Sequence, residues 1–289
     1  MNGRVFRFDH GDYHAGKGVA FTKIKIPSSG KCIRIYSTHT IAQYSVNDHY
    51  HADRISQMWE LGRFIQMTSN SSTDAVVLLG DLNSTPSSLE FQLFQNVSGL
   101  IDTYSTMHPE DIDAATHQDI SVDGKWKRLD HIFISNPHNL WVLEKAEIVL
   151  KSDEDRFYSD HFGVEARLHF LSENSTTLQW ENLGNKKYHS NSLQPNLVDI
   201  LQIAVKSIEA GGENSKKRRK NDCIFMLLVL IFLIVIAFVS NEMNHWIAAI
   251  NSVAVLFIGL MLISMLAITD EVGSLDEIAK EIKYFYRSF

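Results

Sequence analysis

The stretch VVLLGDLN, residues 76–83, decides how we interpret the chain. Its first four residues are apolar and mostly branched, which is typical of a strand buried on both faces. Gly80 permits a sharp turn, and Asp81 and Asn83 follow two positions apart. Because positions i and i+2 point the same way at a strand end, we expect both side chains to face one spot at the rim of a sheet. A carboxylate there can help to hold a hard cation and an amide can donate to a phosphoryl oxygen, but Gly-Asp-x-Asn is also ordinary turn chemistry.

The segments around this stretch indicate a layered α/β fold. An amphipathic helix is predicted over 52–67, with apolar residues on one face: Ile55, Met58, Trp59 and Ile65. A second helix is predicted over 89–94, and 104–125 is predicted to be a long polar loop. Because strand, helix and strand follow one another, we expect helices packed on a sheet. The further strands are predicted at 19–26, 32–36, 128–134, 142–150 and in a last segment that ends at Phe170.

Several polar residues lie at the ends of these predicted strands. His39 follows the strand at 32–36, and Asp130 lies near the start of the strand at 128–134. Asp160 and His161 occupy a loop-to-strand junction, where they can form either an acid–imidazole pair or a capped turn. The glycine-rich segment before the first strand carries Asp12 and Lys17, but it lacks the P-loop spacing, and a hairpin explains its glycines better.

The charge of the chain argues against a nucleic-acid partner. The net charge is -7, and residues 1–172 carry 22 Asp and Glu against 16 Lys and Arg. Proteins that follow a nucleic-acid backbone usually have a basic excess, so a nuclease function is disfavoured. The two cysteines, Cys32 and Cys223, are too few for a disulfide framework, which favours a reducing compartment.

The C-terminal part is predicted to be a membrane anchor. A polar linker over 173–215 contains an amphipathic helix at 195–210 that is expected to end at Gly211-Gly212. Two uncharged runs, 223–240 and 246–268, have the length of transmembrane helices, although a buried hairpin is the alternative. The basic run 216–220 places both termini in the cytosol, with the tail 269–289. It can also bind anionic lipid through Lys216, Lys217, Arg218, Arg219 and Lys220.

Four motifs in this order carry a family resemblance: Thr38-His39-x-x-Ala42, Gly80-Asp81-Leu82-Asn83, Leu129-Asp130-His131-Ile132 and Ser159-Asp160-His161. Together they resemble the DNase I-like metallophosphodiesterase superfamily. Within it the chain looks like a neutral sphingomyelinase of the type 1 kind, because of its segment His10 to Lys17 and its C-terminal pair of apolar runs. The resemblance implies a four-layer α/β sandwich over 1–172, followed by a transmembrane hairpin.

The resemblance also implies roles for individual residues. His161 is expected to be the general base on water, and Asp130 is expected to accept from its other ring nitrogen and fix the tautomer. His39 and Asn83 are expected to donate to the phosphoryl group, and Asp81 to orient the phosphate. The reaction implied is hydrolysis of sphingomyelin in a membrane to ceramide and phosphocholine.

A metal and a gating pair are implied in the same way. Mg²⁺ is the expected cofactor, with Asp81 and Asp160 in the metal region, and Asp12 and Lys17 are expected to gate activity. Family members begin with an Asn-bearing strand and a Glu-bearing segment that would lie ahead of Met1, so the chain looks like an N-terminally shortened form. The alternatives are a phosphodiesterase for a lysophospholipid or phosphoinositide, or an impaired form acting as a membrane protein of the reticulum or another cellular membrane.

Overall fold

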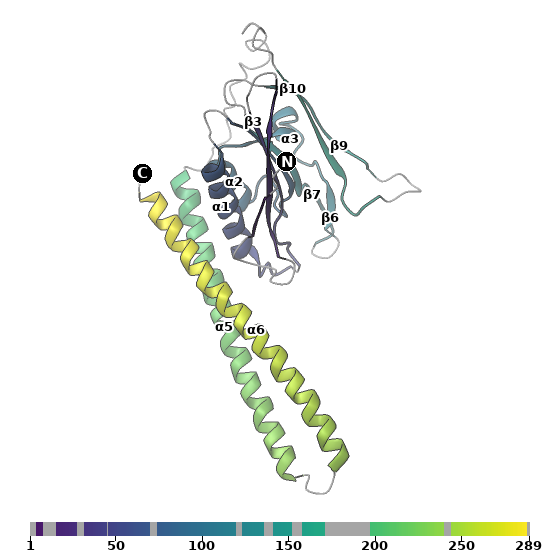
Figure 1. Ribbon diagram of the computed structural model, residues 1–289, viewed down its shortest axis with the longest axis vertical. Helices are drawn as coiled ribbons and strands as arrows, with labels where there is room; N and C mark the ends of the chain where they lie inside the picture. The colour runs from purple at the N-terminus through teal and green to yellow at the C-terminus, as the bar shows by residue number, and fades with distance from the viewer. Residues whose placement is uncertain are drawn as a thin grey trace. The chain divides into compact units, whose positions relative to one another are not determined.

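The computed structural model describes most of the chain in two compact units, Met1–Ala204 and Val205–Phe289. The residues described are 4–7, 16–27, 32–44, 46–69, 74–119, 123–135, 141–151, 158–170, 197–239 and 244–287. The first unit is mixed α/β and the second is helical (Figure 1).

A six-stranded mixed sheet forms the centre of the first unit, in the order β1-β2-β3-β4-β8-β5. Its strands β3 and β4 run parallel, and its other neighbours are antiparallel. β9 and β10 form a two-stranded antiparallel sheet, as do β6 and β7. The strands are β1 (Arg4–Arg7), β2 (Gly18–Lys25), β3 (Cys32–His39), β4 (Asp74–Asp81), β5 (Ile101–Asp102), β6 (His117–Asp119), β7 (Lys125–Lys127), β8 (Asp130–Ile134), β9 (Trp141–Val149) and β10 (Gly163–Phe170).

Two hydrophobic clusters cover the two faces of this sheet. On one face, α1 (His51–Thr68) and α2 (Leu89–Ser98) pack side chains such as Met58 and Phe94 against the strands. On the other face, Trp141 of β9 packs with residues of β4 and β8. Figure 1 shows α1 and α2 on one side of the sheet and β9 on the other. The α/β sandwich is therefore confirmed, with one helical and two sheet layers among the described residues.

The sequence predicted the helix α1 and its buried face correctly. Ile55, Met58, Trp59 and Ile65 are all buried, as their helical spacing requires. The helix α2 begins after Ser88, whose side chain caps it by accepting from the Phe91 amide. β1 pairs antiparallel with β2, as the hairpin interpretation requires, whereas residues 8–15 of the glycine-rich segment lie outside the described residues.

Two local predictions are wrong. The apolar stretch of β4 is not buried on both faces, because Leu79 stays 38% exposed near the rim while Leu78 is fully buried. The segment 104–125 is not one long loop, because α3 (Thr103–Met107) and β6 lie in it. Asp102 caps α3 by accepting from the Ser105 amide.

The second unit consists of α6 (Asn244–Tyr286) and most of α5 (Leu197–Val239). The predicted helix end at Gly211-Gly212 is wrong, because α5 continues through both glycines. Each glycine costs a helix only about 1 kcal/mol relative to alanine. Buried contacts elsewhere can offset that cost, as Ile208 and Ile282 are both fully buried. The basic run 216–220 therefore lies inside a continuous helix.

The predicted transmembrane hairpin is unconfirmed. Within the described residues, we find no helix that is both long enough and apolar enough to span a bilayer. The side chains of 233–255 and 264–270, which include parts of both predicted spans, lie outside the described residues. The linker residues 173–196 also lie outside them.

Cys32 and Cys223 are both free thiols, as expected.

We expect Leu78 and Leu79 to differ sharply in their contribution to stability. Leu78→Ala leaves a cavity between the sheet and its helices, so it should lower the free energy of unfolding by about 2–5 kcal/mol. Leu79→Ala, the matched control in the same strand, should cost less than about 1 kcal/mol. Urea unfolding followed by tryptophan fluorescence measures both values. Equal losses would contradict the core described above.

Candidate active site

The site begins where the parallel strands β3 and β4 end together. Their register places His39 opposite Asp81, the last residue of each strand. His39 Nε2 lies 3.4 Å from Asp81 Oδ2. The imidazole is half-exposed and the carboxylate is mostly buried. The sequence motifs ending in His39 and Asp81, 42 residues apart, are therefore brought together by a single pairing of strands.

Gly80 makes this pairing possible because nothing larger fits. Its φ is 151°, a value that side chains other than glycine rarely adopt. A Cβ built on it would lie 1.9 Å from the carbonyl oxygen of Thr38 on the neighbouring strand. Any side chain here would push β3 and β4 apart, and His39 would lose its place beside Asp81.

Asp81 and Asn83 come together by a turn and not by strand alternation. The strand β4 ends at Asp81, and Asn83 adopts a positive φ of 45°. The Asn83 amide donates to Asp81 Oδ1 at 2.8 Å, and its side-chain Nδ2 donates to the Thr40 carbonyl at 3.0 Å. The turn and the site, which the sequence left as alternatives, are thus the same structure.

Asp130 and His161 complete the group. Asp130 is the first residue of β8 and pairs opposite Asp81. His161 comes from the segment before β10, and its Nδ1 lies 2.7 Å from Asp130 Oδ2. Because an ionised carboxylate only accepts, this contact places a proton on Nδ1 of His161. In the neutral imidazole, Nε2 is then unprotonated and can accept a hydrogen bond or a proton. The four residues His39, Asp81, Asp130 and His161 therefore converge at one edge of the sheet.

The junction at 158–161 contains both arrangements that the sequence allowed. Ser159 Oγ accepts from the His161 amide at 3.1 Å and donates to Asp160 Oδ1 at 3.2 Å, which makes a capped turn. The carboxylate that binds the imidazole is Asp130 and not the adjacent Asp160, which is exposed.

In each acid–imidazole contact, the pKa values of the carboxylate and of the imidazole are shifted in opposite directions. The hydrogen bond to Asp130 raises the pKa of His161. Burial alone would raise the pKa of Asp130, but its hydrogen bonds with His161 and Thr116 hold that pKa below its ordinary value. Burial raises the pKa of Asp81 and lowers the pKa of His39. His39 is thereby favoured in its neutral form, and its contact with Asp81 is a dipolar one.

The described residues contain two groups that could hold a metal ion. Asp81, Asp130 and His161 form one, and His117, Asp160 and His161 form the other. The two predicted metal ligands, Asp81 and Asp160, thus fall into different groups that share His161. Asp81 fits a cation well, because burial and the nearby charge of Asp130 both raise its pKa, and a cation would relieve both effects.

The predicted gating pair is only half described. Asp12 lies outside the described residues. Lys17 precedes β2, and its positive charge adds to the effect of burial in lowering the pKa of His39. Lys17 is therefore near the site, and its pairing with Asp12 stays a prediction.

Sequence reasoning missed Thr116 and His117, which lie in the segment assigned to a loop. Thr116 is fully buried, and its Oγ1 accepts from the amides of Leu129 and Asp130 at 3.0 and 3.2 Å. His117 stacks on His161 with ring centroids 4.3 Å apart, and its Nδ1 bonds the Asp160 carbonyl. The one signal was an adjacent Thr-His pair among polar residues, which is too common to single out.

A cluster of buried polar and charged side chains supports the turn that follows β4. Arg128 donates to Asp102 at 2.7 Å and to His131 Nδ1 at 2.9 Å. Since a guanidinium can only donate, His131 Nδ1 accepts, and His131 Nε2 must donate to the Ser84 carbonyl at 2.9 Å. His131, which stands beside Asp130 in its motif, is thus a buried support for the turn and is not one of the four converging residues.

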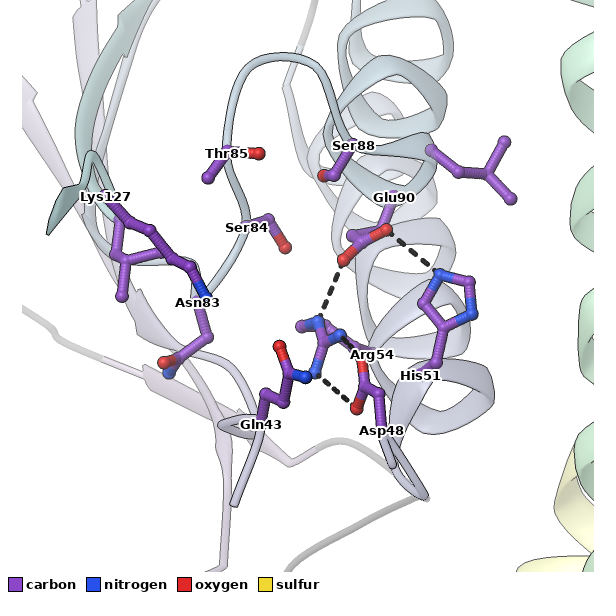
Figure 2. Close-up of a pocket in the computed structure, with 12 residues that line it drawn as sticks. Gln43, Asp48, His51, Arg54, Asn83, Ser84, Thr85, Ser88, Glu90 and Lys127 are labelled. Atoms are coloured by element: carbon purple, nitrogen blue, oxygen red, sulfur yellow. Dashed lines mark hydrogen bonds and ion pairs between the residues drawn. The ribbon is translucent and has the colours of Figure 1, made fainter. Parts of the chain in front are cut away.

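A second cluster connects α1 to the start of α2. Arg54 donates to Glu90 Oε1 at 2.9 Å and also bonds Asp48. His51 Nε2 lies 3.3 Å from Glu90 Oε2. Figure 2 shows these four side chains side by side along the wall of a pocket next to Asn83.

The fold and the site together define a class, an α/β sandwich with an acid–imidazole pair and further carboxylates at one edge of its central sheet. The chain belongs to the Endonuclease/Exonuclease/phosphatase family, whose model matches residues 5–161. That match includes all four converging residues.

Three curated relatives are similar to the chain. A putative neutral sphingomyelinase of Caenorhabditis elegans is 28% identical over 82% of this chain and 57% of its own length. Sphingomyelin phosphodiesterase 2 of Mus musculus is 31% identical over 58% and 43%. Inositol phosphosphingolipids phospholipase C of Schizosaccharomyces pombe is 25% identical over 58% and 46%. The chain spans about half the length of these relatives.

Replacing Asp130 should change the titration of His161. Asp130→Asn removes the charge that His161 Nδ1 bonds, so the pKa of His161 should fall from above its ordinary 6.5 toward or below that value. Asp160→Asn, the matched control, should lower it much less, because Asp160 acts only through a weaker charge effect. NMR titration of the imidazole measures both shifts. Equal shifts in the two variants would contradict the assigned pair.

Glu90→Gln should destabilise the protein in a pH-dependent way. Burial alone would raise the pKa of Glu90, but bonds with His51 and Arg54 hold it at about 2, against an ordinary 4.5. Ionised Glu90 thus stabilises the fold above pH 4.5, and this contribution disappears as the pH falls toward 2. The variant should lose about 3 kcal/mol at pH 7 and progressively less between pH 4.5 and 3. Urea unfolding across this range tests it, and a loss that does not vary with pH would refute it.

Proposed function

We propose that the protein is a Mg²⁺-dependent phosphodiesterase that hydrolyses sphingomyelin to ceramide and phosphocholine at a membrane surface. The observation that carries the proposal is the contact of 2.7 Å between His161 Nδ1 and Asp130 Oδ2, with Asp81 beside both. Family membership supports phosphoester chemistry, and relatives named for sphingomyelin support the substrate.

His161 is proposed as the general base. Its Nδ1 is occupied by Asp130, so Nε2 is the nitrogen that takes the proton from the attacking water. The carboxylate stabilises the imidazolium that forms, because its charge already raises the pKa of His161. Thr116 keeps the start of β8, and with it Asp130, in place through two backbone amides.

Asn83 and His39 are proposed to bind the phosphoryl oxygens. The Asn83 side chain uses one N–H for the Thr40 carbonyl, and this bond orients the second N–H. Neutral His39 carries one ring N–H and can donate it to an oxygen of the phosphate. His39 is held by the pairing of β3 with β4, and Asn83 by its bonds to Asp81 and Thr40, so both groups need little reorganisation.

Asp81, with Asp130 close to it, is proposed as the Mg²⁺ ligand of the first group, and Asp160 as the ligand of the second group, beside His117. Bound there, the ion would supply positive charge that offsets the negative charge developing on the phosphoryl oxygens. The carboxylate donors suit a hard cation, and the raised pKa of Asp81 indicates where positive charge is lacking.

A phosphodiesterase for an inositol-bearing sphingolipid is the second candidate for the reaction. It is favoured by the similarity to a relative named as an inositol phosphosphingolipids phospholipase C. The same residues would perform the same displacement, because the headgroup lies outside the reacting atoms.

The C-terminal helices are proposed to anchor the protein in the reticulum or another cellular membrane, with both termini cytosolic. The uncharged runs 223–240 and 246–268 support this. So do apolar side chains of α5 that stay about half exposed, such as Leu227, Leu228 and Phe232. The adjacent basic run 216–220 is proposed to bind anionic lipid. Anchoring would confine the site to the surface where its substrate lies.

His161→Ala should lower the turnover of sphingomyelin by several powers of ten, because it removes the imidazole that Asp130 orients as the proposed general base. The assay is Mg²⁺-dependent release of phosphocholine from sphingomyelin vesicles. His169→Ala, a matched control on the exposed side of β10, should retain full activity. Near-normal turnover by His161→Ala, or turnover that survives a Mg²⁺ chelator, would refute the mechanism.

A further inference from the structure

A pocket of about 290 Å³ opens beside the proposed active site (Figure 2). Its walls come from the segment before α1, from α1 itself, from the turn after β4 and from the start of α2, together with Lys127 at the end of β7 and Leu129. Asn83 belongs both to this pocket and to the site, whereas His161 and Asp130 do not line it. A molecule whose phosphate is bound by Asn83 can therefore place another of its groups in the pocket.

Ser84 gives the pocket an unmet hydrogen-bonding group. Its side chain is 2% exposed, and its Oγ has no hydrogen-bond partner within the described part of the chain. Figure 2 shows this hydroxyl directed into the space between the turn and Arg54. A buried hydroxyl without a partner costs about 1–3 kcal/mol, and a ligand that bonds it recovers that cost.

The charges of the pocket are already balanced. Arg54 is engaged by Asp48 and Glu90, and Glu90 also faces His51. Lys127 also lines the pocket, and its Nζ lies 3.4 Å from Asp123 Oδ1. The remaining polar lining is neutral and comes from the hydroxyls of Ser84, Thr85 and Ser88 and from the amides of Gln43 and Asn83. The described lining contains no Trp, Tyr or Phe, the residues that hold a quaternary ammonium group. The pocket thus suits a neutral group that bears hydroxyl or amide functions, and it does not suit choline.

We propose that this pocket binds the amide and 3-hydroxyl of the sphingoid base, with Ser84 Oγ bonding the 3-hydroxyl. This inference rests on the proposed function, since it concerns the same substrate. In sphingomyelin, the only neutral hydroxyl and amide groups lie on the alcohol that leaves. In an in-line displacement that alcohol departs opposite the attacking water, away from His161. The volume is small for a whole lipid, so the pocket takes the polar part and the chains stay in the membrane.

The first arm of the test is kinetic and compares two substrates. Ser84→Ala should lower kcat/KM for sphingomyelin about three- to tenfold, the effect of one neutral hydrogen bond. It should leave the 3-deoxy analogue within about twofold. Ser87→Ala, a matched control in the same turn whose side chain is exposed and does not line the pocket, should change neither. Because Ser84 Oγ has no partner to lose, the Tm of Ser84→Ala should not fall.

The second arm measures binding and needs no turnover. Short-chain N-acetylsphingosine should bind the wild-type protein about three- to tenfold more tightly than Ser84→Ala, as measured by isothermal titration in detergent. Its 3-deoxy form should bind both equally. If the protein hydrolyses neither sphingomyelin nor its 3-deoxy analogue, the proposed function fails. The binding measurement still tests whether the pocket binds the 3-hydroxyl. Losses that are equal for the 3-hydroxy and 3-deoxy compounds, or absent for both, would overturn the proposal.

Discussion

The close backbone approach of β3 and β4 at Gly80 is the constraint on which the site depends. The missing Cβ lets the strand run within contact of the Thr38 carbonyl, and the parallel register then fixes His39 opposite Asp81. On its other edge the same strand pairs with β8, which brings Asp130 opposite Asp81. Three side chains of the candidate site thus receive their positions from one strand, and a sheet edge holds them more rigidly than separate loops would.

Two buried charge clusters support the turn that follows β4. Arg128 orients His131, which donates to the Ser84 carbonyl, and Arg54 fixes Glu90 at the start of α2. Buried ion pairs add little net stability, because desolvation offsets most of their attraction. Arg54 and Arg128 nevertheless each bond partners that come from different parts of the chain. We infer that their main effect is to specify one conformation of the turn between Asp81 and Glu90.

Local pattern predicted most elements, and tertiary packing decided the rest. The spacing of Ile55, Met58, Trp59 and Ile65 was enough to predict α1, because helical period directly encodes a buried face. The exposure of Leu79 could not be predicted, since it depends on how far the layer over β4 extends. Nor could Thr116, whose role exists only because β8 starts beside it. The converging residues were recognised through family motifs, whereas Asn83 reached its position by a positive φ that strand alternation does not predict.

The two carboxylates at the centre of the site differ only in their surroundings. Asp130 has His161 and Thr116 as partners, which stabilise its charge, so it is suited to orient an imidazole. Asp81 is buried to the same extent, but it lies opposite Asp130 and has neutral His39 as its neighbour, so its charge is poorly compensated. Environments that move two carboxyl pKa values in opposite directions usually assign them different tasks. The same physical argument that favours Asp130 as the partner of the proposed base therefore favours Asp81 as the proposed cation ligand.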